Sequence, residues 1–275
     1  MLRVMFWWAW LRLKLGTQRM RRAALAALAL KPSPRAIHVL LLALDSRLYK
    51  SAEEALVRVG RTASPHLIRA FSQSTDRGSV ARTRAYRERI AHVLARLREP
   101  AAVEPLIRWL TSGEKGAGAV ATSLGILGDG RAVGPLSSAL ADPRLRLETV
   151  QGLRYFKDPS TMDSLIRAVE NIDPADGSRG TYYSALAHAL VRFKDVRAIR
   201  PLVYAALEIV DPAFVSNHVA PLGPLGVDPL LEILRDPRAH RRVLEAVKSL
   251  ERLNWRPGNS DDAFWYGVAK GQSQT

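Results

Sequence analysis

The stretch Asp129-Gly130-Arg131-Ala132-Val133-Gly134-Pro135-Leu136 decides the fold, because variants of it recur along the chain. Clear copies begin at Pro100, Asp158 and Asp195, and weaker copies follow the same pattern. The equivalent positions are His38, Pro65, Pro105, Pro135, Ser164, Pro201 and Pro229, which are 27, 40, 30, 29, 37 and 28 residues apart. A repeat of this period predicts a solenoid of helix pairs. The two longer steps predict insertions near Gln73–Arg87 and Asn171–Gly180.

The composition of the repeated phrase fits the start of a helix. Asp or Gly with Pro ends the preceding helix, and Pro is tolerated in the first turn of the next because its missing N–H would have no partner there. After the phrases, apolar residues recur at spacings of three and four, as on a helix with one buried stripe. Examples are Val150, Leu153 and Phe156; Leu186, Leu190 and Phe193; and Leu244, Val247, Leu250 and Leu253. No segment alternates apolar and polar residues over a useful length, so we expect an all-α chain without strands.

The segment Leu124–Leu136 resembles the LG-x-LGDPRAV-x-PL phrase of short bacterial HEAT-like repeats, the type first named from phycobilin lyase subunits. The ending Leu253–Gly258, followed by Ala263–Tyr266, is similar to the LGW-x-P closing segment of many such proteins. The resemblance extends over about Lys31 to Lys270. It implies an armadillo-like, right-handed α-solenoid of about seven HEAT-like helix pairs, with a concave surface lined by the second helix of each pair. It is weak for function, because these repeats serve unrelated roles.

These features predict three segments of the chain. They are an N-terminal capping or anchoring helix in residues 1–30, a repeat solenoid in residues 31–254, and a C-terminal cap and tail in residues 255–275. In a solenoid each repeat contacts only its neighbours, so we expect one elongated body. The absence of cysteine excludes disulfides and thiolate metal sites. We expect a cytoplasmic monomer, with peripheral membrane association as an alternative.

The formal net charge of +15 is concentrated at one end of the chain. Residues 1–100 hold 20 Lys or Arg and 6 Asp or Glu, a difference of +14, whereas residues 101–275 hold 21 and 20, a difference of +1. This asymmetry predicts an anionic partner at the N-terminal end: nucleic acid, a lipid surface or an acidic protein. The alternative is that the arginines only solvate the outer faces of helices.

The N-terminal segment Val4–Leu11 is apolar and carries Trp7, Trp8 and Trp10 beside basic residues. It is too short for a transmembrane helix, which needs about 20 apolar residues, and no signal-peptide cleavage site follows it. Two interpretations remain. The segment caps the first repeat, as atypical terminal repeats do, or it anchors the chain at a membrane interface or on a partner, where tryptophan rings are favourable.

The sequence shows no pattern of catalytic, cofactor-binding or metal-ligating residues. The six histidines are scattered without an i, i+4 pair, so we expect them to face solvent or to form hydrogen bonds on helices. Gly116-Ala117-Gly118 lacks the strand and the lysine of a phosphate loop and predicts a tight turn between helices. The acidic pairs Glu53-Glu54 and Asp261-Asp262 fit helix starts. We therefore expect a protein that is not an enzyme and holds no cofactor or metal.

Polar residues expected on the second helices are the candidates for partner binding, because arginine and tyrosine are enriched at interface hot spots. They are Arg82, Arg84, Arg87, Arg89, Arg144, Arg146, Arg154, Tyr182, Tyr183, Arg238, His240, Arg241 and Arg242. The alternative for each is an ordinary exposed helix face.

The expected function is that of a non-enzymatic scaffold that binds a protein partner in the concave groove. One alternative is nucleic-acid or anionic-membrane binding through the basic end. HEAT-like alkylpurine DNA glycosylases show that such an architecture can embrace DNA, although no active-site residue of theirs has a match here. A second alternative, from the phycobilin lyase resemblance alone, is an auxiliary subunit of a lyase or similar modifying enzyme.

Overall fold

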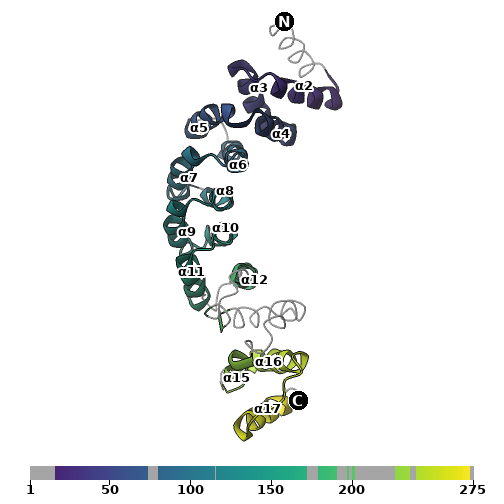
Figure 1. Ribbon diagram of the computed structural model, residues 1–275, viewed down its shortest axis with the longest axis vertical. Helices are drawn as coiled ribbons and strands as arrows, with labels where there is room; N and C mark the ends of the chain where they lie inside the picture. The colour runs from purple at the N-terminus through teal and green to yellow at the C-terminus, as the bar shows by residue number, and fades with distance from the viewer. Residues whose placement is uncertain are drawn as a thin grey trace. The chain divides into compact units, whose positions relative to one another are not determined.

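The computed structural model describes residues 16–73, 80–114, 116–171, 179–190, 197, 200–201, 227–235 and 240–272, with the backbone alone at 80–83, 179, 240–245 and 272. The chain divides into two compact units, Met1–Ala139 and Leu140–Thr275. All regular elements in these described ranges are helices (Figure 1), so the prediction of an all-α chain is confirmed. None of the described helices is long and apolar enough to cross a bilayer.

Helices of the first unit alternate between two rows (Figure 1). One row contains α2 (Gln18–Leu30), α4 (Tyr49–Val59), α6 (Val80–Arg96) and α8 (Ala121–Leu127), and the other contains α3 (Pro34–Leu44), α5 (Ser64–Ser72), α7 (Val103–Leu110) and α9 (Val133–Ala139). Neighbours within a row are in contact, such as α6 with α8 and α7 with α9. Short 3-10 turns precede four of these helices: η1 (Gly60–Ala63), η3 (Pro100–Ala102), η4 (Ala117–Val120) and η5 (Gly130–Ala132).

The second unit has the same kind of helices. They are α10 (Arg146–Leu153), α11 (Pro159–Glu170), α12 (Arg179–Leu190), α15 (Val227–Leu234), α16 (His240–Arg252) and α17 (Ser260–Gln272). α12 packs against α10 and α11, and α15, α16 and α17 contact one another. Asp261 and Asp262 lie in the first turn of α17, as predicted, and both accept from Arg235 Nη2, at 2.8 and 2.7 Å.

The repeated phrase starts helices because its Asp side chain caps the first turn and its Pro is tolerated there. The side chain of Asp129 accepts the backbone N–H of Arg131 at 3.0 Å, and that of Asp158 accepts the backbone N–H of Ser160 at 2.8 Å. Pro159 lies in the first turn of α11. A carboxylate at a helix start satisfies an N–H that has no helical partner. The phrase is therefore a helix-capping signal, and each copy that the structure describes in full is followed by a helix.

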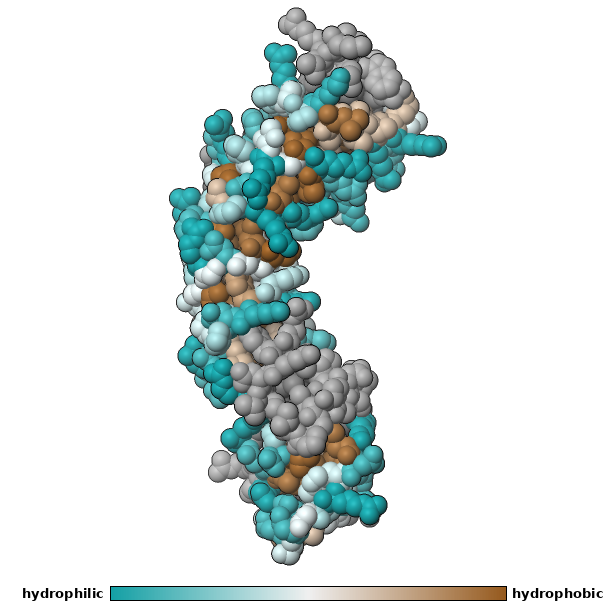
Figure 2. All heavy atoms as spheres, viewed as in Figure 1, coloured by the Kyte–Doolittle hydropathy of each residue, from teal (hydrophilic) through white to brown (hydrophobic). Residues whose placement is uncertain are grey.

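The core consists of leucines and small residues from the repeated phrases. Ala102 is fully buried and leaves room for close helix contact. Leucines at one position of four phrases have no exposed surface: Leu106, Leu136, Leu165 and Leu230. On the face of the first unit that Figure 2 shows, hydrophobic residues lie along the seam between the rows, with hydrophilic residues on both sides. Burial of this stripe stabilises the stack because each fully buried leucine contributes about 1.5–3 kcal/mol.

The turn before α8 depends on Gly116. Its φ of +87° lies in the left-handed region, and it precedes η4, so the predicted tight turn is confirmed. A Cβ at this position would lie 2.3 Å from Nε of Arg84. Glycine is therefore required both by the backbone angle and by the neighbouring side chain.

The prediction that Glu53 and Glu54 lie at a helix start is wrong. α4 begins at Tyr49, and its first turn holds no acidic residue. The reason is the earlier turn, in which the hydroxyl of Ser46 accepts the backbone N–H of Leu48 at 3.1 Å. Oε2 of Glu53 lies 3.5 Å from Nδ1 of His92 instead.

Part of each predicted insertion falls outside the described residues. In the first, Gln73–Arg87, helix α6 begins at Val80, so its last part is helical, and residues 74–79 are not described. In the second, Asn171–Gly180, residues 172–178 are not described.

Candidate functional site

A groove lies between α10 and α12, two neighbouring helices that the chain separates by α11. The helices bury one stripe each, including Val150, Leu153 and Leu186, and the remaining faces are free to line a surface. The groove has a volume of about 510 Å³ and is lined by Leu147, Glu148, Gln151, Arg154, Thr181, Ser184, Ala185 and His188. We call it the α10–α12 groove.

Helical spacing places these side chains in two facing rows. Leu147 and Gln151 of α10 and Arg154, which directly follows α10, are four and three residues apart. Thr181, Ser184 and His188 of α12 are three and four residues apart. Residues three or four apart on a helix are surface neighbours. Each row therefore follows the groove for about two helical turns, or roughly 10 Å at 1.5 Å per residue.

Hydrogen bonds orient the polar side chains of the α10–α12 groove. Nη1 of Arg154 donates to Oε1 of Gln151 at 2.8 Å, and its guanidinium lies over the ring of Tyr155, 5.6 Å from the centroid. Nδ1 of His188 donates to the carbonyl oxygen of Ser184 at 2.7 Å. These contacts reduce the number of conformers that Arg154 and His188 would have to lose on binding.

The charge and polarity of the α10–α12 groove suit a peptide. Its two formal charges, on Glu148 and Arg154, are of opposite sign, so the lining has no net charge when His188 is neutral. Leu147 is 37% exposed and supplies an apolar contact. Amide, hydroxyl and guanidinium groups beside an apolar side chain match the mixture of a peptide backbone and its side chains.

Arg146 and the two candidate tyrosines support α10 and α12 rather than line the groove. The guanidinium of Arg146 lies 4.6 Å from the ring centroid of Tyr182. Tyr182 is 4% exposed and Tyr183 is also buried. Burial raises the pKa of Tyr182 to about 12, against a smaller opposing effect of the Arg146 charge. This contact joins α10 to α12.

Three candidate arginines on α6 form contacts within the first unit. Arg87 is buried, with its guanidinium 5.1 Å from the ring centroid of Trp109, and Nη1 donates to Oε2 of Glu114 at 2.8 Å. Arg89 donates to the carbonyl oxygen of Leu44 at the end of α3. Nε of Arg84 donates to Oε1 of Glu88 at 2.7 Å. These contacts hold α6 against its neighbours.

Among the other candidates, Arg144 is exposed before the start of α10. It forms two hydrogen bonds with the carboxylate of Asp142, at 3.1 and 2.8 Å, and these hold the pKa of Asp142 below its usual value. The remaining predicted positions lie outside the residues whose side chains are described: Trp7, Trp8, Trp10, Arg82, Arg238, His240, Arg241 and Arg242. Among the predicted residues whose side chains the structure describes, Arg154 lines the α10–α12 groove.

Sequence reasoning missed most of the α10–α12 groove because its lining is neutral. The sequence candidates were chosen for charge and aromatic area, whereas Gln151, Thr181 and Ser184 carry neither. A signal was present in the polar residues at steps of three and four on the side of each helix away from its buried stripe. That signal needs the helix bounds before it can be recognised.

The chain was compared with models of known protein families and with curated proteins, and neither comparison finds a match.

Proposed function

We propose that the chain is a right-handed α-solenoid of HEAT-like helix pairs that binds a protein partner without catalysing a reaction. The single observation that carries the proposal is the α10–α12 groove, a surface formed by two helices from successive pairs. The repeated capping phrase and the two rows of helices in the first unit support the repeat architecture. In such architectures the surface of one row provides an extended binding face.

The partner that fits the α10–α12 groove is an extended polypeptide segment. A groove with no net charge gives no reason to prefer nucleic acid, whose binding is dominated by contacts from cations to phosphates. Its volume of about 510 Å³ accommodates several side chains rather than a large domain. Gln151 of α10 and Thr181 of α12 both line the groove and have side chains that can donate to or accept from peptide groups.

Site-specific photo-crosslinking in cells tests the proposal. A photoreactive amino acid replaces Gln151 or Thr181 in the groove, and Glu170, an exposed residue of α11, in the matched control. We expect one protein to crosslink from both groove positions and not from position 170. Identification of that protein as a lyase or another modifying enzyme would assign the auxiliary-subunit role.

A pair of leucine variants distinguishes binding in the α10–α12 groove from non-specific hydrophobic binding. Leu147→Asp places a charge in the α10–α12 groove, whereas Leu42→Asp places one on α3, where Leu42 is 53% exposed. We expect only Leu147→Asp to abolish the crosslink. Equal crosslinking in both variants, with both proteins folded, would contradict the proposal.

A further inference from the structure

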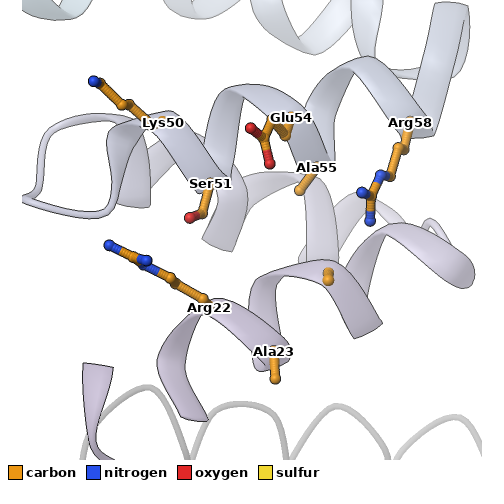
Figure 3. Close-up of a pocket in the computed structure, with 8 residues that line it drawn as sticks. Arg22, Ala23, Lys50, Ser51, Glu54, Ala55 and Arg58 are labelled. Carbon is orange, nitrogen blue, oxygen red and sulfur yellow. The ribbon is translucent and has the colours of Figure 1, made fainter. Parts of the chain in front are cut away.

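A second groove lies between α2 and α4 in the first unit (Figure 3). Its volume is about 480 Å³. α2 contributes Arg22, Ala23 and Ala26 to its lining, and α4 contributes Lys50, Ser51, Glu54, Ala55 and Arg58. We call it the α2–α4 groove. Three of the lining side chains are small, and four carry a charge.

The cations of the α2–α4 groove have no acidic partner among the residues that the structure describes. Arg22, Lys50 and Arg58 are exposed and form no ion pair with any residue that the structure describes. Helical spacing would allow Glu54 to pair with Lys50 or Arg58, each four residues away. Within the described residues, neither pair forms. Three cations and one carboxylate therefore give the groove a charge of +2 that is available to a ligand.

The surrounding charge reinforces the attraction for anions. Residues 16–73 hold ten Lys or Arg and three Asp or Glu, a difference of +7. A basic field of this kind raises the local concentration of anions and the rate of their association. The charge of the α2–α4 groove contrasts with the neutral α10–α12 groove of the second unit.

We propose that the α2–α4 groove binds a polyol phosphate, either as a free metabolite or as the headgroup of a lipid. Arginine forks match phosphate oxygens in geometry and charge. In Figure 3 the side chains of Arg22 and Ser51 are directed to the same end of the groove, where the guanidinium and the hydroxyl both donate to the phosphate. Lys50 is located near that end with its side chain directed away from α2, and Arg58 is located at the other end.

Glu54 defines the rest of the ligand. Its carboxylate lies between the two ends of the α2–α4 groove (Figure 3), and an ionised carboxylate accepts hydrogen bonds but donates none. A bare phosphate dianion is repelled by it, whereas a hydroxyl on the carbon beside the phosphorylated carbon donates to it. The combination of donors at one end and an acceptor in the middle therefore selects a phosphate that carries neighbouring hydroxyl groups.

Calorimetric titration of the full chain with inositol monophosphate and with inorganic phosphate tests this site. We expect inositol monophosphate to bind more tightly at low salt. Replacing Arg22, Lys50 and Arg58 together by glutamine should weaken the affinity for inositol monophosphate by at least about tenfold. The variant Glu54→Gln should strengthen the binding of inorganic phosphate and reduce the preference for inositol monophosphate. Flotation with phosphatidylcholine vesicles, with and without phosphatidylinositol monophosphate, distinguishes the lipid source from the soluble one.

A matched control keeps the net charge equal. Arg35, Arg61 and Arg69 are exposed in the same unit but do not line the α2–α4 groove, so their triple replacement by glutamine removes the same charge elsewhere. Binding that survives in this control and fails in the groove variant supports the site. Equal weakening in both variants would show a general electrostatic effect and overturn the proposal, as would the absence of binding to either probe and to the vesicles at low salt. DNA binding that is insensitive to the groove variant would also count against it.

Discussion

Replacing Gly116 by alanine should destabilise the first unit by about 2 kcal/mol. A left-handed backbone costs an alanine roughly 1–2 kcal/mol, and the φ at this position is +87°. The new Cβ would also lie 2.3 Å from Nε and 2.8 Å from Cγ of Arg84, so that side chain must move. Moving it breaks the exposed pair with Glu88, which adds about 0.3–0.5 kcal/mol. Urea unfolding followed by circular dichroism measures the difference.

Gly134 provides a control with the opposite sign. It lies within α9, has no positive φ, and a Cβ there would meet no atom within 4 Å. Gly134→Ala should therefore stabilise the unit by about 0.5–1 kcal/mol. In an Arg84→Ala background, Gly116→Ala should lower the free energy of unfolding only by the cost of the left-handed backbone, because no Arg84 side chain has to move. Equal effects of the two glycine substitutions would refute the reasoning.

The other predictions concern the core, a buried cation and two titrating groups. Leu106→Ala should cost about 2–5 kcal/mol in the same urea assay, since Leu106 is fully buried; a cost below about 1 kcal/mol would contradict the assigned core. Arg87→Ala should lower the free energy of unfolding by about 2 kcal/mol, because the guanidinium lies over the rings of Phe71 and Trp109. Glu114→Gln should lower it by less than about 1 kcal/mol, because Glu114 is half exposed. Equal losses in the two variants would assign the stability to the ion pair. The raised pKa of Tyr182 should make stability fall as pH rises from about 10 to about 12, and Tyr182→Phe should remove that slope. The carboxylate of Asp129 has a lowered pKa through its hydrogen bonds to Arg131, so its stabilising effect should be lost as pH falls below about 4, and Asp129→Asn should flatten that part of the acid titration.

The helix starts were predictable from the sequence because their cause is local. Asp129 and Asp158 bond to backbone groups two residues away, and Pro159 acts through its own ring, so a short phrase contains all the information. The buried leucines were predictable for the same reason, since their spacing defines one helix face. Glu53 and Glu54 were misplaced because the start of α4 is determined by the turn at Ser46, which carries no acidic residue.

The contacts of the candidate arginines could not be predicted from the sequence, because they depend on which helix packs against the helix that carries each arginine. Arg87 is buried by Trp109 from another helix, and Arg89 reaches the end of α3, 45 residues away in the sequence. Both were expected on an open surface, as was Tyr182, which Arg146 covers. A charged side chain gives the same sequence signal whether it faces solvent or spans two helices. The neutral residues of the α10–α12 groove, such as Gln151, give almost no signal.

Hydrogen exchange of the complex with the crosslinked partner tests the central claim most directly. Backbone amides are compared in the free chain and in the complex, across α10 (Arg146–Leu153), α11 (Pro159–Glu170) and α12 (Arg179–Leu190). We predict that protection increases in α10 and α12 and stays unchanged in α11. Protection confined to α11, or found only in the first unit, would contradict partner binding through the α10–α12 groove.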